Sequence, residues 1–407
     1  MRYAWLWAIR HLIHRRERTL TAVAGIAFAA ILIFLEMGFL GGVDRTATLL
    51  FDRLQFDLLI TSSEYEDLSR TATFPDQRLA QVRAAEGVVA VVPLSMGFAE
   101  WRMPQRHGWL RHSSGGEIMS IAVLAAPPEY LARAFRIGPD GVFSTPVEAE
   151  EAAHLLTRQN TFLFDRRSKT EYGSAEYWLE QSRRRNPQDP VLINGRSAVI
   201  AGTFSLGTGF SWNALLLTSE STFREFLPQP QNGVHFGLIQ LSAGTQPAVV
   251  QQQLQARLPP DVRIWTREDI TASERNYWVR LTSVGQFLVV AVVLVVIVGV
   301  VFVYQMMAAD IRSMLPEYAT IKALGHTPGF ATAMVLAQAS LLAGLGFLPG
   351  WGMAVFFYSL ARTYGGIPAE MTPLIVTAVA GLTVGMCLLS AVLALRKVHT
   401  ADPADLF

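Results

Sequence analysis

The ionisable residues of this 407-residue chain form no familiar catalytic pattern. None of its three lysines follows a glycine, so the chain lacks the Walker A sequence that holds ATP phosphates: Lys169, Lys322 and Lys397. Neither the HExxH helix of zinc proteases nor the GxSxG turn of serine hydrolases occurs. The histidines are scattered, and Cys387 is the only cysteine, which excludes an internal disulfide framework. A hydrolytic enzyme is therefore poorly supported, and we expect this chain to hold no cofactor or metal.

One segment, residues 310–327, suits the transmission of mechanical work rather than catalysis. Pro316 and Glu317 are typical of the first turn of a helix, and Gly325 is typical of the position just past its end. From residue 315 onward, apolar side chains recur at every third position: Leu315, Tyr318, Ile321 and Leu324. The pattern predicts a short amphipathic helix that a soluble subunit could grip, although an ordinary connector at a membrane surface would have the same spacing.

Long uncharged stretches flank this segment and set the class of the protein. No Asp, Glu, Lys, Arg or His occurs between Arg280 and Asp310, in residues 327–361 or in residues 371–395. A helix of about 20 apolar residues crosses the hydrocarbon core of a bilayer. We therefore predict transmembrane helices over residues 281–309, 328–361 and 371–395. Because no charged side chain lies within them, a proton- or ion-coupled carrier is disfavoured.

A further transmembrane helix is predicted over residues 19–43. Its apolar part is too long for a cleaved signal peptide, and no small-residue cleavage site follows it. Glu36 lies near its far end, where a carboxylate can reach the interface. The basic segment 1–18 contains apolar side chains at helical spacing: Trp5, Ile9, Leu12 and Ile13. This spacing predicts a cytoplasmic helix that lies flat on the inner leaflet, although a plain basic start to the span would have the same residues.

Basic residues near the helix ends predict the orientation. Nine of them lie in residues 1–18, the loop 310–327 and the tail 396–407, whereas the loop 362–370 contains only Arg362. The positive-inside rule then places both termini in the cytoplasm. Residues 44–280 follow as a large domain on the other side of the membrane, which is the periplasm of a bacterial inner membrane if the family resemblance described below holds. The formal net charge of +1 leaves no basic field for binding nucleic acid.

The predicted periplasmic domain has an α+β pattern. Short β-type runs occur at residues 56–61, 88–93, 118–124, 198–204 and 238–241. Amphipathic helices are predicted over 76–86 and 247–258, and each is followed by a turn and a strand-like phrase, an echo that suggests two related halves. Asn194-Gly195 predicts a β-hairpin turn. The polar segment 148–190 is expected to be a surface excursion.

The first transmembrane helix contains small residues at a spacing that lets helices approach closely. They form two pairs, each four residues apart: Gly25 with Ala29, and Gly38 with Gly42. We consider two uses, contact between two protomers or the ordinary abundance of small residues in membrane helices. Beyond this helix, residues 44–57 and 267–280 are expected to continue the first two spans as stalks toward the large domain.

The phrase LPEYATIKALG, residues 315–325, resembles the coupling segment of ABC exporter permeases in the MacB/FtsX superfamily. Glu317 and Leu324-Gly325 fall on matching positions, whereas Pro316 and residues 318–320 are closer to the DevC branch. Weaker similarities to that branch follow at residues 24–29, 165–168, 193–196, 304–305 and 346–350. The tail, residues 402–405, resembles the usual ending of the family.

The resemblance implies a permease that works as a homodimer with a separate ABC ATPase subunit, which would bind the ATP. The residues that would meet this ATPase are Pro316, Glu317, Tyr318, Ile321, Lys322, Leu324 and Gly325. In the DevC branch, a membrane-fusion (adaptor) protein and a TolC-like outer-membrane channel complete the exporter. Motion of the coupling helices would pass outward through the second span to the periplasmic domains, a mode called mechanotransmission. The association of this branch with glycolipids implies a lipid-like substrate.

Three other functions share parts of this pattern. An FtsX-like signalling permease would activate a periplasmic hydrolase without moving a substrate. A lipoprotein-extraction permease of the LolC/LolE type has the same topology. A membrane-anchored enzyme would need a convergent polar site in the large domain, and the sequence indicates none. A neighbouring gene for a membrane-fusion protein would favour the exporter, and one for a peptidoglycan hydrolase would favour signalling.

Overall fold

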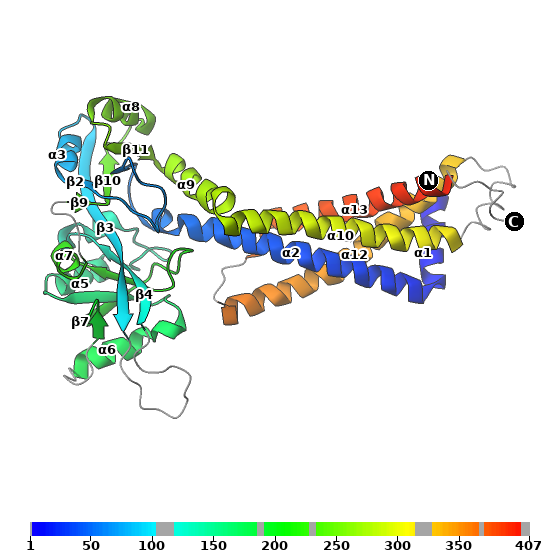
Figure 1. The fold of residues 1–407 in the computed structure, drawn as a ribbon, viewed down its shortest axis with the longest axis horizontal. Helices are drawn as coiled ribbons and strands as arrows, with labels where there is room; N and C mark the ends of the chain where they lie inside the picture. Colours follow the sequence, from blue (N-terminus) through cyan, green and yellow to red (C-terminus); the bar gives the residue numbers. More distant parts are fainter. Residues whose placement is uncertain are drawn as a thin grey trace. The chain divides into compact units, whose positions relative to one another are not determined.

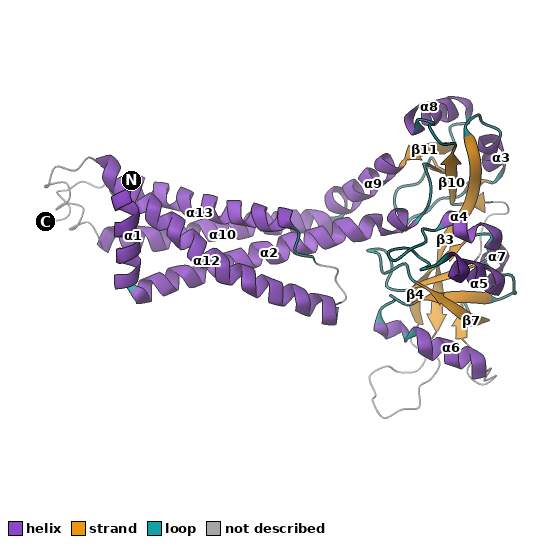
Figure 2. Ribbon diagram, turned by 180° about the vertical axis from the view of Figure 1, so that it is seen from behind, coloured by secondary structure: helices purple, strands orange, loops and turns teal. Residues whose placement is uncertain are grey.

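The computed structural model describes residues 2–102, 118–184, 191–227, 233–313, 328–365 and 370–399. The chain divides into two compact units. The helical unit comprises residues 1–42 and 282–407, and the large domain comprises residues 43–281. Figure 2 shows that the strands belong to the large domain.

The described part of the helical unit is built from α1 (Arg2–His14), the first part of α2 (Arg16–Arg53), α10 (Ser283–Ser313), α12 (Pro328–Gly365) and α13 (Pro373–His399). Four stretches are long and apolar enough to cross a membrane: Arg16–Arg53, Ser283–Ala309, Thr332–Arg362 and Pro373–Arg396. Many exposed side chains on α10 are apolar, as contact with lipid requires, and these include Phe287, Leu294 and Val298. The predicted fold class, four transmembrane helices with a large α+β domain between the first and second, is confirmed.

The helix α2 is 38 residues long without interruption. At 1.5 Å per residue its length is about 57 Å, whereas the hydrocarbon core of a bilayer is about 30 Å thick. It contains no proline, and Gly38, Gly41 and Gly42 lie inside it without breaking it. The helix that crosses the membrane therefore continues as one rod into the large domain, where it ends at Arg53.

The short helix α1 lies crosswise at one end of the bundle (Figure 1). Ala8 and Leu12 are buried, whereas Trp5 and Ile13 are exposed. The hydroxyl of Thr19 donates to the carbonyl oxygen of Leu12 at 2.9 Å and fixes the turn into α2. A helix with one buried side and an exposed apolar side suits a membrane surface. α1 ends at His14 rather than at residue 18, because α2 already begins at Arg16.

Glycines bring α12 into close contact with α2. A Cβ at Gly346 would lie 2.6 Å from the Cβ of Ile26, and one at Gly350 would lie 3.0 Å from the carbonyl oxygen of Ala27. A larger residue at either position would push the helices apart. The glycine pair at positions 346 and 350, part of a phrase that resembles the DevC branch, therefore has a packing role of its own.

Three of the four small residues predicted to contact a second protomer are used inside the chain's own bundle: Gly25, Ala29 and Gly38. The ring of Phe302 from α10 fills the space beside Gly25, and the hydroxyl of Tyr358 from α12 fills the space beside Gly38. Ala29 belongs to the bundle core. These contacts are with helices of the same chain, and a contact of these residues with a second protomer stays a prediction. Gly42 is buried, and its dimer role stays a prediction.

The large domain contains two groups of strands that share the long strand β3 (Val88–Arg102). The first half of β3 is the edge strand of a four-stranded antiparallel sheet. It pairs with β10 (Phe236–Leu241), which pairs with β1 (Leu58–Ser62), and β1 pairs with β11 (Val262–Thr266). Two helices, α3 (Gln77–Arg83) and α8 (Pro247–Arg257), follow β1 and β10 and share one core. The order β11-β1-β10-β3 is that of a β-α-β-β-α-β fold. The predicted echo of helix, turn and strand is the internal repeat of this fold.

The second half of β3 belongs to a closed ring of six strands. After β3, the order around the ring is β4 (Ile118–Ala125), β8 (Leu215–Thr218), β5 (Thr161–Asp165), β7 (Arg196–Phe204) and β6 (Val191–Ile193). The ring closes because β6 also pairs with β3. One set of alternating side chains faces an aromatic core that includes Trp101, Phe164 and Trp178. The hairpin predicted at Asn194-Gly195 joins β6 to β7, and its φ angles of 49° and 73° suit a type I′ turn.

The remaining elements of the large domain are short. The helical ones are η1 (Pro128–Tyr130), α4 (Leu131–Ala134), α5 (Pro146–Leu156), η2 (Thr170–Tyr172), α6 (Ala175–Arg184) and α7 (Glu220–Phe226). The strands β2 (Phe74–Pro75) and β9 (Gly233–Val234) pair separately. At the end of the domain, α9 (Arg267–Asn276) is followed by the π-helical segment η3 (Tyr277–Leu281).

The prediction of a surface excursion over residues 148–190 is wrong. The strand β5, in the middle of this segment, is completely buried in the ring between β8 and β7. The flanking helices are amphipathic, with Ala152 of α5 and Trp178 of α6 buried. Their exposed charged side chains make the average composition polar and hide the five-residue apolar strand between them.

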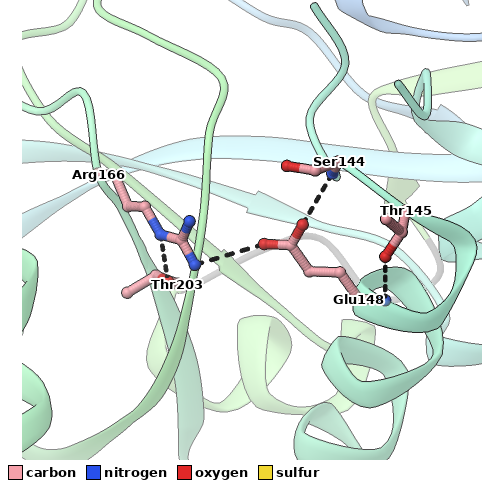
Figure 3. A network of polar contacts seen from close by, with 5 residues as sticks. All are labelled: Ser144, Thr145, Glu148, Arg166 and Thr203. Atoms are coloured by element: carbon pink, nitrogen blue, oxygen red, sulfur yellow. Dashed lines mark hydrogen bonds and ion pairs between the residues drawn. The ribbon is translucent and has the colours of Figure 1, made fainter. Parts of the chain in front are cut away.

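A polar network fixes α5 to the ring of strands (Figure 3). Thr145 caps the helix by accepting a hydrogen bond from the backbone N–H of Glu148 at 3.2 Å, and the Glu148 carboxylate accepts from the backbone N–H of Ser144 at 2.7 Å. Arg166, which follows β5, lies 3.4 Å from this carboxylate and donates to Thr203 of β7 at 2.7 Å. Because these groups are solvent-exposed, they define geometry more than they add stability.

The close contact between α12 and α2 leads to a prediction for Gly346→Ala. The new methyl group would overlap the buried Ile26 at its Cβ, which cannot rotate away. Overpacking of this kind costs about 1–3 kcal/mol. We expect the thermal unfolding midpoint of the full-length protein in detergent to fall by several degrees.

Gly344→Ala is the matched control. Gly344 lies two residues earlier on the same helix, and a Cβ there meets nothing within 4 Å. Alanine stabilises a helix relative to glycine by up to about 1 kcal/mol, so this variant should be neutral or slightly more stable. Equal midpoints for the two variants would contradict the described packing of α12 on α2.

Candidate functional site

The candidate site lies where the two ends of the large domain's chain meet. The first stalk is the part of α2 within this domain, residues 43–53, and the second stalk is α9 with η3. A capping box of Thr266 and Asp269 starts α9, and the hydrogen bonds it makes lower the pKa of Asp269. We define the stalk junction as the side chains that connect the stalks with each other and with nearby loops: Tyr65, Phe210, Arg267, Glu274 and Trp278.

Arg267 holds the C-terminal end of α2. Its guanidinium donates to three carbonyl oxygens, at 2.5 Å, 3.1 Å and 2.9 Å, those of Phe51, Leu54 and Phe56. It also lies 4.0 Å above the ring of Phe56. The last carbonyls of a helix lack partners and carry partial negative charge, so an arginine placed there caps the helix. Because Arg267 is the first residue of α9, the cap joins the end of one stalk to the start of the other.

An exposed ion pair joins the stalks at a second point. The Nε atom of Arg275 lies 3.2 Å from the Oδ1 atom of Asp44, and both side chains are about half exposed. Solvent screens such a pair, which contributes at most about 1 kcal/mol. The pair can therefore break and re-form more easily than the cap made by Arg267.

Glu274 is a completely buried carboxyl group on α9. The Tyr65 hydroxyl donates to one of its oxygens, and the Trp278 indole N–H donates to the other at 3.2 Å. Burial raises the pKa of Glu274 to about 7 and the charge of Asp67 adds to the shift, while the hydrogen bonds from Tyr65 and Trp278 oppose it. Because Tyr65 lies in the loop after β1, this carboxyl group fastens that loop to the second stalk.

A buried aspartate orders the loop that follows β7. Asp165, at the end of β5, accepts hydrogen bonds from the backbone N–H groups of Leu206 at 3.1 Å and Gly207 at 2.7 Å. Burial raises the pKa of Asp165, while these hydrogen bonds oppose the shift. Gly207 has a φ of 113°, which favours glycine. The loop is therefore held in one shape by the ring of strands.

The same loop touches both stalks. A Cβ at Gly207 would lie 3.3 Å from the side chain of Leu49 on α2. Three residues later, the ring of Phe210 lies 4.5 Å from that of Trp278 in η3, centroid to centroid. Trp278 thus contacts this loop on one side and donates to Glu274 on the other. The ring of strands and the loop after β1 are both connected to the second stalk through this residue and Glu274.

The second stalk changes its helical geometry at the junction. Residues Tyr277–Leu281 form a π-helix between α9 and α10. Single π-helical turns are rare and occur frequently at functional sites. The irregular turn contains Trp278, so a rotation or shift of the helix beyond it would act first on the contacts of Trp278.

The titratable groups of the large domain are held in different surroundings. Within the part of the chain that the structure describes, no three His, Cys, Asp or Glu side chains are placed to hold a metal ion. His235 is buried, and burial lowers its pKa to about 4, so it is neutral at physiological pH. The stalks are joined by the helix cap made by Arg267 and by the screened ion pair of Arg275 with Asp44, and the buried carboxyl group of Glu274 joins the second stalk to the loop after β1. These contacts would respond differently to a shift of one stalk.

The predicted coupling residues all lie outside the described residues: Pro316, Glu317, Tyr318, Ile321, Lys322, Leu324 and Gly325. Their role toward an ATPase therefore stays a prediction. The sequence analysis did not identify Arg267, Glu274 or Trp278. The available signal was the capping-box spacing of Thr266 and Asp269, which marks the start of the second stalk.

Residues 289–403 match the family model described as FtsX-like permease C-terminal. The matched segment begins in α10 and includes α12, α13 and the predicted coupling segment 310–327. The resemblance to permeases of the MacB/FtsX superfamily is confirmed, whereas the DevC branch stays a prediction.

No curated protein matches the chain. Among solved structures, the chain is similar to the periplasmic region of MacB from Actinobacillus actinomycetemcomitans, with 11% identity over 54% of this chain and 92% of that chain and a TM-score of 0.33. It is also similar to the extracellular domain of the noncanonic ABC-type transporter YknZ from Gram-positive bacteria, with 12% identity over 52% of this chain and 99% of that chain and a TM-score of 0.31. At these TM-scores the two structural similarities do not support a function for this chain.

The buried carboxyl group of the stalk junction predicts a pH dependence. The pKa of Glu274 is about 7 in the folded protein, above the ordinary value of 4.5. The stabilisation from keeping this carboxyl group protonated is present below pH 4.5 and is lost as the pH rises through about 7. It amounts to at most about 3 kcal/mol. Glu274→Gln should therefore flatten the decline of the thermal unfolding midpoint of the full-length protein between pH 5 and pH 8.

Glu268→Gln serves as the control, because Glu268 is exposed on the same helix. This variant should follow the wild-type pH profile. If Glu274→Gln declines as steeply as the wild type, Glu274 does not titrate in this range and the described burial of its carboxyl group is contradicted.

Proposed function

We propose that the chain is the transmembrane permease subunit of an ABC-type exporter in a bacterial inner membrane. In this proposal both termini are cytoplasmic, and residues 43–281 form a periplasmic domain. A separate ATPase subunit binds and hydrolyses ATP, and a second copy of the chain completes the transmembrane part. A membrane-fusion protein and a TolC-like channel carry a lipid-like substrate across the periplasm and the outer membrane.

The observation that carries the proposal is the FtsX-like permease match at residues 289–403. The Walker A sequence is absent from the chain, so the energy for transport has to come from another subunit. The predicted coupling segment lies between two apolar helices, α10 and α12, which is where such a subunit could act on both of them.

The continuous helices support a mechanical route for this energy. α2 runs unbroken from Arg16 to Arg53, and α10 is separated from α9 only by the π-helical turn η3 and Thr282. A displacement at the cytoplasmic end of α10 would reach η3 along one helix. The contacts of Trp278 with Glu274 and Phe210 would then pass it to two loops of the large domain. Substrate need not cross the uncharged spans.

Co-purification tests the proposed partners. The protein should be isolated from its native host in mild detergent and its partners identified by mass spectrometry. We expect an ABC ATPase together with a membrane-fusion protein. An ATPase with a periplasmic hydrolase would overturn the exporter in favour of a signalling permease. Absence of an ATPase under several mild conditions would overturn the proposal of ATP-driven coupling.

Glu317→Ala tests the coupling segment. Loss of this carboxylate should reduce the amount of co-purifying ATPase, or leave ATP hydrolysis intact without export. Glu268→Ala, at an exposed position of α9, is the matched control and should behave as the wild type. A Glu317→Ala variant with wild-type ATPase binding and wild-type export would remove this residue from the mechanism.

A further inference from the structure

The helical unit contains a cavity beside α1 that the proposed transport mechanism does not use. Its volume is about 330 Å³, within the range of small-molecule sites. It lies between α1, the first turns of α2, the C-terminal part of α10 and the first half of α12. All of these elements belong to the helical unit, so the cavity is a feature of one compact body.

The polar side of the cavity is basic. Its polar lining residues are His11, Arg15, Arg18, Thr19, Thr21 and Gln338. Among the described lining residues, none is acidic. The N-terminal turn of α2 adds the partial positive charge of a long helix. Guanidinium groups with hydroxyl and amide side chains nearby are the groups that bind a phosphate.

The other lining residues of the cavity are apolar. They include Met306 and Met307 of α10 and Leu342 of α12, which belong to or pack against the core of the bundle. A free inorganic anion would gain nothing from such side chains. A molecule with a phosphate and an adjoining apolar part would use both kinds of lining residue.

The surroundings of the cavity indicate where such a molecule comes from. On α1, the side chains of Trp5, Leu6, Ile9 and Ile13 are 44%, 56%, 42% and 58% exposed, and Leu20 on α2 is 67% exposed. Arg10 and His14 are exposed on the same helix α1. An apolar surface mixed with cations is typical of a helix that lies in the headgroup region of a membrane. The cavity therefore lies beside a segment that is suited to contact lipid headgroups.

We propose that this cavity binds the headgroup phosphate of an anionic phospholipid, with Arg18 and Arg15 facing the phosphate and the methionines facing the glycerol and acyl part. Basic pockets between membrane helices are known to take such headgroups. In the proposed orientation the lipid belongs to the inner leaflet, but the site itself does not depend on the transport function. The bound lipid would pin α1 to α2, α10 and α12.

Lipid binding to the full-length protein in detergent tests the proposal. Native mass spectrometry and the thermal unfolding midpoint should be recorded with phosphatidylglycerol, phosphatidylcholine and inorganic phosphate. We expect phosphatidylglycerol to remain bound and to raise the midpoint, with little effect from the other two. Equal effects of phosphatidylcholine would overturn the proposed role of the basic side. Equal effects of inorganic phosphate would identify a site for a soluble anion and overturn the lipid.

Two arginines in the first turn of α2 provide a matched pair of variants. Arg18 lines the cavity and Arg16 does not, although both side chains are exposed. Arg18→Gln should weaken phosphatidylglycerol binding about fivefold, and Arg16→Gln should leave it near the wild-type value. Because Arg18 is exposed, its replacement should not disturb folding, and Arg18→Lys should retain most of the binding.

Two results for these variants would contradict the proposal. Equal weakening by Arg16→Gln and Arg18→Gln would mean that the lipid responds to surface charge and not to the cavity. Unchanged lipid binding by Arg18→Gln with loss of the co-purifying ATPase would assign the cavity to a protein partner. A failure of the transport proposal would instead leave lipid binding intact and remove only the ATPase, so the two can be told apart.

Discussion

The contact of Arg267 with the end of α2 is the interaction on which the large domain depends most directly. A helix of 38 residues ends there, and its last carbonyl groups need donors. Arg267, the first residue of α9, donates to one of them, that of Phe51, and to the carbonyls of Leu54 and Phe56 just beyond the helix, so the two ends of the domain's chain are fixed to each other. The neighbouring backbone of residues 53–55 also bonds to α4 and the residues after it, through Ala134 and Arg136. The end of the first stalk is therefore fixed both to α9 and to the segment around α4.

Three of the four predicted transmembrane stretches contain no charged side chain. A side-chain proton relay or a dehydrated ion site would need ionisable groups in the bundle, and residues 281–309, 327–361 and 371–395 contain no Asp, Glu, Lys, Arg or His. Close glycine contacts make the interface between α2 and α12 rigid. The proposed transmission of force would use these helices, the π-helical turn η3 and the stalk junction.

The sequence predicted the elements that depend on local composition and missed those that depend on distant partners. The transmembrane helices follow from uninterrupted apolar runs, and the hairpin follows from Asn194-Gly195, because both signals are local. The strand β5 was missed because amphipathic helices on both sides masked its apolar residues. The partner of Gly25 was not predictable either, since spacing indicates close packing without saying which helix supplies Phe302.

The stalk junction shows the same limit. Glu274 looks like an ordinary acidic residue of a polar helix, and its burial depends on Tyr65, which lies 209 residues earlier in the sequence. Arg267 likewise meets α2 across 216 residues. No short-range pattern contains such pairs. The predicted stalk boundaries were close to the observed helices because they follow from the ends of apolar runs, but the contacts between the stalks required the folded chain.

We propose that nucleotide binding in a partner ATPase moves the stalks of the large domain. Ala272 is exposed on α9, and the buried Cys387 is the only native cysteine, so Ala272→Cys in a Cys387→Ala background gives one labelling position per chain. The distance between spin labels in the two copies of the reconstituted complex should be measured with ATP, with ADP and without nucleotide. We expect ATP to shift the distance distribution. An unchanged distribution in a complex that hydrolyses ATP would contradict the account.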